Sequence, residues 1–566
     1  MMEDLYLTVK QLNVVTNAEE KPLLKNVGFS IPRGKTVAFV GESGSGKSLT
    51  SLALMGLLDT AKLRVIGGEI TITPAGLETH ATPLNLSDDV AATERRGRDF
   101  AMIFQEPMSA LNPLMTCGKQ VLESALIFSQ GNTQQAKRLV LELFQEVQLP
   151  NPEMVYEKYP HEISGGQRQR VMIAMAIASS PSLLIADEPT TALDVTVQSE
   201  VLKLLKSLQV KRAMSLLFIT HDLAVVSEIA DEVVVMWRGE MVEAGKVADV
   251  LSQPKHPYTQ ALISCRPAPD SKGKSLITVS DVIESRSTTA LDARRVTDNV
   301  LLEAASLRKH YRNSSGQSIT KALDEISFCI NSGETLGLVG ESGCGKSTLS
   351  RLLMGFIKPD MGTAIYNFSS GGKVILPAES RNDLKMLRSK VQLVFQDPFS
   401  SLNPKMLVRD ILMEPMMNYA SIERAQRDSQ IVELLNQVGL AADSANKFPH
   451  EFSGGQRQRI VIARALACKP ELLICDESVA ALDVSVQAQV LNLLNSLKAE
   501  LGLTLLFISH DLNVVYYMSD RIMVMNKGRI EEMGSADKVF YHPESEYTRR
   551  LLSSLPGRKG SIAPEG

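Results

Sequence analysis

Short apolar runs bounded by turn residues recur along this chain and predict strands. Leu183–Ala186 is one such run, and it predicts a buried strand of a parallel sheet. Thr36–Val40 and Leu216–Ile219 have the same character. Leu5–Val15 and Leu24–Ile31 lie on either side of a polar turn, which predicts two antiparallel strands. These runs favour an α/β fold.

Two longer segments, Leu114–Lys158 and Met406–Lys447, are predicted to be mostly helical. Within the first, four apolar residues follow the i, i+3, i+4, i+7 spacing of one helix face. We expect this face to belong to the core rather than to a binding surface: Val140, Leu143, Phe144 and Val147.

The pattern is present twice. Ser164-Gly165-Gly166-Gln167-Arg168, the strand ending in Asp187-Glu188, and Ala192-Leu193-Asp194 return in the same order in the second half. The offset is constant at 289 residues (164 to 453, 188 to 477 and 194 to 483). The chain therefore carries one functional unit twice.

A glycine-rich segment follows a predicted strand in each half. Gly41–Ser48 and Gly340–Ser347 both have the form G-x-x-x-x-G-K-[ST] and both precede a predicted helix. Glycines let backbone N–H groups and the helix N-terminus point at a phosphate. The lysine reaches the β- and γ-phosphates, and the hydroxyl after it binds Mg²⁺. The predicted phosphate-binding residues are Gly41, Ser43, Gly44, Gly46, Lys47 and Ser48, with Gly340, Ser342, Gly343, Gly345, Lys346 and Ser347.

Polar residues end several predicted strands, at the sheet edge where open α/β folds bind ligands. Of two adjacent carboxylates, one can hold Mg²⁺ and the next can polarise an attacking water. A strand-end glutamine can bind the metal or the water, and a neutral histidine can contact the γ-phosphate. We predict these roles for Asp187, Glu188, Gln105 and His221, and for their copies Asp476, Glu477, Gln396 and His510.

Composition excludes several classes of protein. The net charge of −4 gives no basic excess for nucleic acid. No apolar run approaches the ~18 residues of a membrane span, and Met1-Met2-Glu3-Asp4 lacks the basic region of a signal peptide. The six cysteines include no C-x-x-C pair, so we expect reduced, packed thiols and no iron–sulfur cluster.

Segment 267–299 interrupts the repeat. It contains proline, glycine and many small polar residues, so we expect a flexible or loosely packed linker. The predicted domains are therefore 1–266 and 300–556, and 557–566 is expected to be a disordered tail.

In both halves the ordered motifs resemble those of the ATP-binding cassette (ABC) ATPases. The resemblance implies two tandem P-loop domains, each with a mainly parallel core sheet, an antiparallel β subdomain and a helical subdomain. It assigns Walker A to the glycine-rich loops, Walker B to Asp187 and Asp476, and the Q-loops to Gln105 and Gln396. It makes Glu188 and Glu477 the catalytic carboxylates and His221 and His510 the switch histidines. It implies Mg²⁺ ligation by Ser48, Gln105, Asp187, Ser347, Gln396 and Asp476.

The resemblance also implies that the two cassettes pack head to tail around two ATP molecules. Walker A of one cassette then faces the signature motif of the other, Ile163–Gln167 or Phe452–Gln456. The implied signature contacts are Ser164, Gly165, Gly166 and Gln167, with Ser453, Gly454, Gly455 and Gln456.

Longer segments narrow the resemblance to the peptide and nickel importer branch of the family. Gln105–Pro113, Gln396–Pro404, Ala192–Gln198 and His256–Leu262 carry it, and the second tail motif, His542–Thr548, has an apparent insertion. Cytosolic cassette ATPases of ribosomes have basic helical linkers, and those of excision repair have zinc-binding C-x-x-C insertions. Neither feature is present, so we favour the importer, with a nickel chelate or an opine as alternative substrates.

The importer interpretation implies further partners. We expect two integral-membrane permease subunits, a periplasmic or surface substrate-binding protein that acts through them, no nucleic acid, and one chain per transporter. The chain is then peripheral, on the cytoplasmic face of the bacterial inner membrane. A short permease helix is expected to dock beside each Q-loop.

An aromatic residue stacks on adenine in this family, and here the two halves differ. Aligning Leu307–Tyr311 with Leu12–Thr16 puts Tyr311 opposite Thr16. We therefore expect two competent sites of unequal affinity, unless another side chain covers adenine in the first half.

Overall fold

The computed structural model describes residues 4–73, 84–86, 95–97, 99–105, 110–128, 132–191, 193–284, 290, 296–312, 319–369, 371–378, 380–419, 424–480 and 482–555. The chain forms two compact units, Met1–Leu193 with Val197–Ile263, and Asp194–Thr196 with Ser264–Gly566. The tail predicted to be disordered lies outside the described residues. Among the helices in these ranges, none is both long enough and apolar enough to cross a bilayer.

The first unit is built on a six-stranded sheet in the order β10-β9-β3-β8-β7-β6. All neighbouring pairs are parallel except β9 with β10. Every residue of the central strands is buried and most are apolar, as the short runs predict. The strands are β3 (Thr36–Val40), β6 (Phe100–Ile103), β7 (Leu183–Asp187), β8 (Ser215–Thr220), β9 (Glu232–Trp237) and β10 (Glu240–Lys246).

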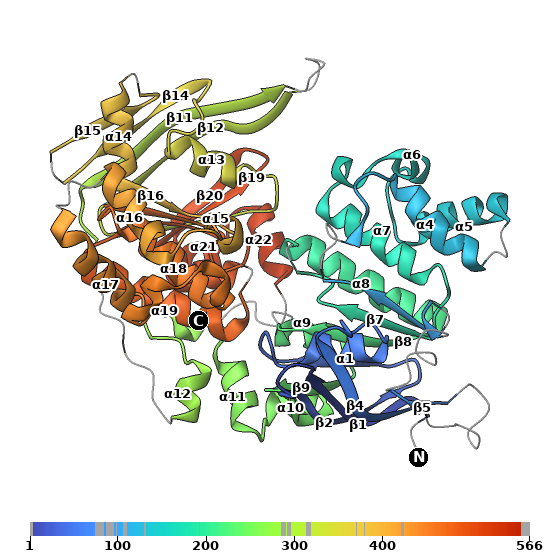
Figure 1. Ribbon diagram of the computed structural model, residues 1–566. Helices are drawn as coiled ribbons and strands as arrows, with labels where there is room; N and C mark the ends of the chain where they lie inside the picture. The colour runs from blue at the N-terminus through green and yellow to red at the C-terminus, as the bar shows by residue number, and fades with distance from the viewer. Residues whose placement is uncertain are drawn as a thin grey trace, which may run out of the picture. The chain divides into compact units, whose positions relative to one another are not determined.

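A second, antiparallel sheet covers part of this core in the order β2-β1-β4-β5. Figure 1 shows these strands at one end of the unit and helices α4–α7 at the other. The predicted helix face of Val140, Leu143, Phe144 and Val147 is buried in the core. The strands are β1 (Leu5–Thr16), β2 (Pro22–Pro32), β4 (Leu63–Ile72) and β5 (Leu84–Asn85). The helices are α1 (Lys47–Leu54), α4 (Cys117–Phe128), α5 (Thr133–Glu146), α6 (Pro152–Glu157), α7 (Gly165–Ile177), α8 (Val195–Arg212), α9 (Leu223–Ile229), α10 (Val247–Ser252) and α11 (Pro257–Ser264), with the 3₁₀ turn η1 (Pro160–Glu162).

The second unit repeats both sheets. Its core order is β16-β17-β18-β13-β19-β20 and its antiparallel order is β12-β11-β14-β15. The core strands are β13 (Thr335–Val339), β16 (Val391–Val394), β17 (Leu472–Asp476), β18 (Thr504–Ile508), β19 (Arg521–Asn526) and β20 (Arg529–Ser535). The antiparallel strands are β11 (Val300–Arg312), β12 (Ile319–Asn331), β14 (Met361–Asn367) and β15 (Lys373–Leu376).

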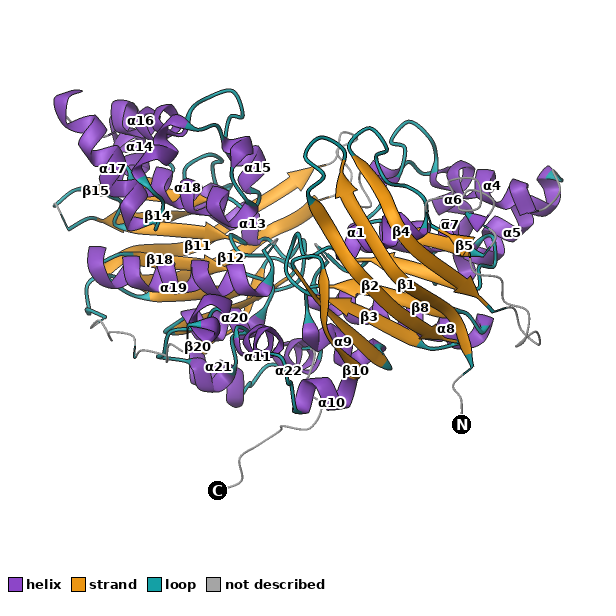
Figure 2. Ribbon diagram, turned by 60° about the horizontal axis from the view of Figure 1, so that its bottom comes forward, coloured by secondary structure: helices purple, strands orange, loops and turns teal. Residues whose placement is uncertain are grey.

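Helices α14, α16 and α17 form a group beside the strands of this unit (Figure 2). The helices are α13 (Lys346–Leu353), α14 (Arg381–Lys390), α15 (Pro398–Ser401), α16 (Val408–Tyr419), α17 (Arg427–Gln437), α18 (Gly454–Leu466), α19 (Val484–Leu501), α20 (Leu512–Met518), α21 (Ala536–Tyr541) and α22 (Glu546–Ser553). The 3₁₀ turns are η3 (Arg424–Gln426), η4 (Ala442–Asn446) and η5 (Pro449–Glu451).

The segment expected to be a loose linker is well packed where it is described. It contains η2 (Pro269–Ser271) and α12 (Val279–Ile283) and groups with the second unit. Leu276 is only 3% exposed, and the Asn492 side chain bonds both its N–H and its carbonyl at 2.8 Å. Side-chain hydrogen bonds, which composition does not reveal, therefore hold this segment on α19.

The tail motif of the second half has no insertion, contrary to the sequence-based expectation. Glu243 accepts hydrogen bonds from the N–H groups of Lys255 and His256, and Glu532 accepts them from Glu544 and Ser545. Glu243 and Glu532, Lys255 and Glu544, and His256 and Ser545 are each 289 residues apart. The two tails therefore have equal length over this segment. The second His-Pro pair lies three residues earlier in its tail, which produced the apparent insertion.

Candidate active site

Each glycine-rich loop joins a central strand to the helix that begins at its lysine. Gly46 precedes α1 in the left-handed region at φ 106°, as Gly345 precedes α13 at φ 114°, a conformation that costs glycine little. A Cβ on Gly46 would lie 2.6 Å from the Leu24 side chain. The loop is thus closed tightly, with its backbone turned toward a phosphate site.

The loop lysines lie inside their own loops. Lys47 Nζ donates hydrogen bonds to the carbonyl oxygens of Gly41 at 2.8 Å and Glu42 at 2.9 Å. Lys346 Nζ bonds Gly340 at 2.6 Å and Glu341 at 3.0 Å. Both ammonium groups are buried, so their charge is concentrated where a phosphate would bind.

The first acidic residue of each pair lies beside a hydroxyl group of the following helix. Ser48 Oγ donates to Asp187 at 3.0 Å, whereas Asp476 receives its bond from Ser350 at 2.7 Å, one helical turn beyond Ser347. Burial raises the pKa of Asp187 to about 6 and outweighs the Ser48 hydrogen bond. A buried carboxylate beside a hydroxyl supplies the hard oxygen ligands that Mg²⁺ prefers, so Ser48 and Asp187 fit the ion. In the second cassette the hydroxyl beside Asp476 belongs to Ser350 and not to the predicted ligand Ser347.

The second acidic residue is held by three side chains in the first cassette. Glu188 Oε2 accepts hydrogen bonds from Gln105 Nε2 at 3.0 Å and Thr191 Oγ1 at 2.9 Å, and His221 Nδ1 lies 3.3 Å away. The sequence predicts that Gln105 binds the metal or the attacking water, whereas here its amide contacts the Glu188 carboxylate. Thr191 is not among the predicted site residues, although a hydroxyl three residues after Glu188 was a local signal.

The second cassette repeats this arrangement with one difference. Gln396 Nε2 donates to Glu477 Oε2 at 2.9 Å, and His510 Nδ1 lies 3.7 Å from the same oxygen. Ala480 takes the place of Thr191, 289 residues later, and has no hydroxyl group. Lys346 Nζ lies 3.9 Å from the other Glu477 oxygen.

Each glutamate lies beside a histidine, and the two side chains shift each other's pKa. Burial by itself raises the pKa of Glu188, but the hydrogen bond and charge of His221 lower that pKa to about 2. Burial lowers the pKa of His221, and Glu188 more than compensates, so that pKa is raised. A carboxylate with so low a pKa is a weak proton acceptor.

Both glutamates have left-handed backbones, with φ 46° for Glu188 and 49° for Glu477. Such a conformation is uncommon outside glycine and is concentrated at functional sites. It turns the chain sharply after β7 and β17 and brings each carboxylate to its glutamine.

The signature serines cap helices. Ser164 accepts a bond from Gln167 N–H while the Gln167 side chain bonds Ser164 N–H, and Ser453 and Gln456 do the same. These are capping boxes at the first turns of α7 and α18. The predicted ATP contacts of the signature residues remain a prediction.

The strand ladder supports the equivalence of Thr16 and Tyr311. Val15 pairs with Pro22, and His310 pairs with Lys321. Pro22 and Lys321 are 299 residues apart, as are the loop lysines (47 to 346). The residues that follow, Thr16 and Tyr311, are therefore equivalent. Tyr311 is 42% exposed, and Lys309 Nζ lies 5.8 Å from the centroid of its ring.

Comparison with known proteins gives consistent matches. The family described as "ABC transporter" matches residues 24–191 and 323–480, and "Oligopeptide/dipeptide transporter, C-terminal region" matches 242–289. The chain is 42% identical to the glutathione import ATP-binding protein GsiA of Pectobacterium atrosepticum, over 94% of this chain and 86% of that protein. It is also 42% identical to GsiA of Escherichia coli K12, over 97% and 89%. A solved structure of the cassette MJ0796 bound to ADP and Pi aligns with TM-score 0.37 and 28% identity, covering 42% of this chain and 99% of that one.

Burial at the second loop generates a prediction about cysteine reactivity. Cys344 is 4% exposed, and burial raises the pKa of its thiol. A maleimide reacts with the thiolate, so we expect Cys344 to react more slowly than Cys329, which is partly exposed. Mass spectrometry of the native chain after brief labelling measures both rates. Faster labelling at Cys344 would show that this loop is open rather than packed.

Proposed function

The chain belongs to the ABC transporter family as an ATP-hydrolysing subunit with two fused cassettes, and on this premise we propose that it powers the import of glutathione or short peptides. The observation that supports this proposal is that the site is present twice. Each half holds a phosphate loop, a Walker B carboxylate and a glutamine–glutamate–histidine cluster within its own fold. Both halves thus have the groups that hydrolysis needs.

We propose that each ATP binds between the two cassettes. Lys47, Ser48, Asp187 and Glu188 would face Ser453–Gly455, and the corresponding residues of the second cassette would face Ser164–Gly166. The signature groups would contact the γ-phosphate only when the cassettes close. ATP would then bind the closed state better than the open state, which is how a ligand drives a conformational change.

Mg²⁺ would be held by Ser48 and Asp187, and by Ser347 and Asp476. When bound, it would neutralise charge on the β- and γ-phosphates. The lysine supplies a second positive charge to the same phosphates. Gln105 and Gln396 would leave their glutamates and turn toward the metal or the attacking water. Each glutamate would then orient that water, beside His221 or His510.

The substrate class is proposed from the relatives. Their printed names specify glutathione import, and the match at 242–289 is to an oligopeptide and dipeptide transporter region. Glutathione is itself a short peptide, so the two matches agree. A substrate-binding protein and the membrane pore would choose the cargo, because this chain meets only their cytoplasmic side.

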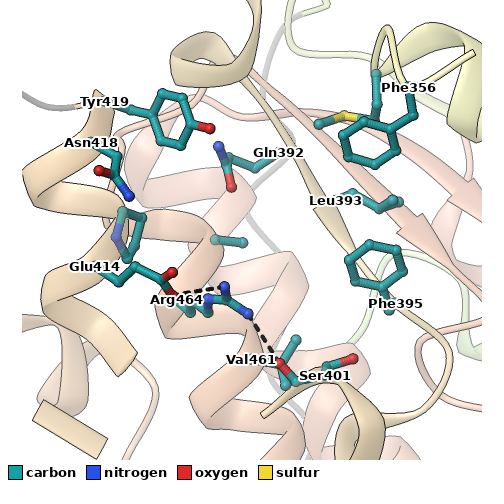
Figure 3. A pocket seen from close by; sticks show the side chains of 13 residues that line it. Phe356, Gln392, Leu393, Phe395, Ser401, Glu414, Asn418, Tyr419, Val461 and Arg464 are labelled. Carbon is teal, nitrogen blue, oxygen red and sulfur yellow. Dashed lines mark hydrogen bonds and ion pairs between the residues drawn. The ribbon is translucent and has the colours of Figure 1, made fainter. Parts of the chain in front are cut away.

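We propose that two permease subunits hold the chain at the cytoplasmic face of the inner membrane. In the second cassette, a hollow of about 220 Å³ lies between the core and the helical region and is lined by Phe395, the residue before Gln396. Phe356 and Phe395 line it and are 48% and 44% exposed. Figure 3 shows these rings on one side and α16 with Asn418 and Tyr419 on the other. A short apolar helix from a permease would fit between them.

Replacing the catalytic carboxylates tests the assigned chemistry. Glu188→Gln with Glu477→Gln should lower ATP turnover by about 10²- to 10³-fold, as expected when an electrostatic group of the transition state is lost. ATP binding should persist because the phosphate loops are intact. Glu142→Gln, on the exposed side of α5, is the control. Wild-type turnover by the double variant would contradict the assignment.

Filling the hollow tests the docking site. Asn418→Trp places a large ring in it and should abolish co-purification with the permease pair, while the isolated chain still binds ATP. Met417→Trp adds the same ring at the neighbouring exposed position of α16, outside the residues that line the hollow. Equal permease recovery with both variants would exclude this surface.

Exchanging the adenine-side residues tests the inequality of the sites. A tyrosine face offers a base about 1–3 kcal/mol of stacking, or roughly 5- to 100-fold in affinity. Thr16→Tyr should tighten the first site, and Tyr311→Ala should weaken the second. Equilibrium binding of labelled ATP measures both. Changes below about twofold in both variants would refute stacking at these positions.

A further inference from the structure

A tyrosine of the tail helix contacts the phosphate loop in each cassette. The N–H of Glu42 donates a hydrogen bond to Tyr258 Oη at 2.9 Å, and the N–H of Glu341 donates one to Tyr547 Oη at 3.3 Å. The two tyrosines are 289 residues apart (258 to 547), so the corrected tail alignment makes them equivalent. The contact is therefore present in both halves of the chain.

The residue that each tyrosine contacts also accepts a hydrogen bond from the loop lysine. The carbonyl of Glu42 accepts a bond from Lys47 Nζ at 2.9 Å, and the carbonyl of Glu341 accepts one from Lys346 Nζ at 3.0 Å. Each residue is thus held at its N–H by the tyrosine and at its carbonyl by the lysine. A shift of the tyrosine would move the lysine's carbonyl partner.

The loop has little room to move on its other side. A Cβ on Gly41 would lie 2.2 Å from the carbonyl oxygen of Met236, at the end of β9, and the same holds for Gly340 and Met525 of β19. The first residues of the loop are therefore confined between a core strand and the tail tyrosine.

Tyr258 is itself firmly placed. It is 1% exposed, and its ring stacks on Trp237 with 5.3 Å between centroids and 20° between planes. The turn before α11 is fixed by the two hydrogen bonds to Glu243. The hydroxyl oxygen is thus an acceptor with a fixed position rather than a mobile group.

We infer that Tyr258 and Tyr547 are positioning residues that hold each phosphate loop, through Glu42 and Glu341, in the conformation that receives ATP. This inference rests on the proposed function, in which Gly41–Ser48 and Gly340–Ser347 bind the ATP phosphates. It gives the tail motif a physical role in the reaction. The tail would transmit to the nucleotide any displacement imposed on it.

Tyr258→Phe isolates the hydroxyl because it keeps the ring that stacks on Trp237. Because this variant loses one hydrogen bond, ATP affinity at the first site should fall about 3- to 10-fold, which corresponds to about 0.6–1.4 kcal/mol. Trp237 is the single tryptophan of the chain and touches Tyr258. Titrating its emission in the full-length chain with MgATP therefore reports the first cassette alone. Equilibrium dialysis of labelled ATP with Lys346→Ala chains, in which the second site is disabled, gives a second measurement.

Two matched variants separate positioning from general stability. Tyr6→Phe removes the hydroxyl of another buried tyrosine of the first cassette, and should lower the unfolding temperature without changing ATP affinity. Tyr547→Phe should leave the Trp237 titration unchanged and weaken ATP binding at the second site, measured in Lys47→Ala chains.

The inference is overturned if Tyr258→Phe binds ATP within twofold of the wild type, even when its unfolding temperature falls. It is also overturned if Tyr6→Phe weakens binding as much as Tyr258→Phe. A wild-type chain that binds no ATP would instead contradict the proposed function.

Discussion

The contact between a glutamine amide and a glutamate carboxylate, Gln105 with Glu188 and Gln396 with Glu477, organises the proposed site in each cassette. It joins the ends of two neighbouring parallel strands in each sheet. Both glutamates have left-handed backbones at this point. The histidine beside Glu188 lowers the pKa of that carboxylate. Because the histidine makes the carboxylate a weak proton acceptor and the glutamine holds it in place, we propose that activity requires both contacts to rearrange.

That requirement links the chemistry to the membrane partners. The hollow proposed for the permease helix is lined by Phe395, the residue before Gln396. A partner that presses on Phe395 acts directly on the strand end that holds Glu477. At the phosphate loop of the same cassette, the N–H of Glu341 donates a hydrogen bond to Tyr547. We therefore propose that each site responds to the permease through its Q-loop and to the tail through its tyrosine.

Local patterns predicted most of the fold and site. The phosphate loops, the strand ends and the repeat could be predicted from the sequence, because each depends on neighbouring residues and fixed spacing. Three features could not be read, because they depend on contacts between distant residues. Asn492 holds Leu276 of segment 267–299 against α19, the Glu532 bonds fix the register of the second tail, and Gln105 contacts the Glu188 carboxylate. Thr191 was missed although it lies close to Glu188 in sequence, because threonine after a strand usually has no such role.

Reconstitution of the chain with its permease pair in proteoliposomes tests the central claim most directly. ATP hydrolysis and glutathione uptake are measured together, with and without a substrate-loaded binding protein on the outer side. The account predicts that both rates rise together when the loaded binding protein is added, because the partners release the glutamates for catalysis. An unchanged hydrolysis rate, with no uptake, for glutathione and for short peptides alike would contradict it.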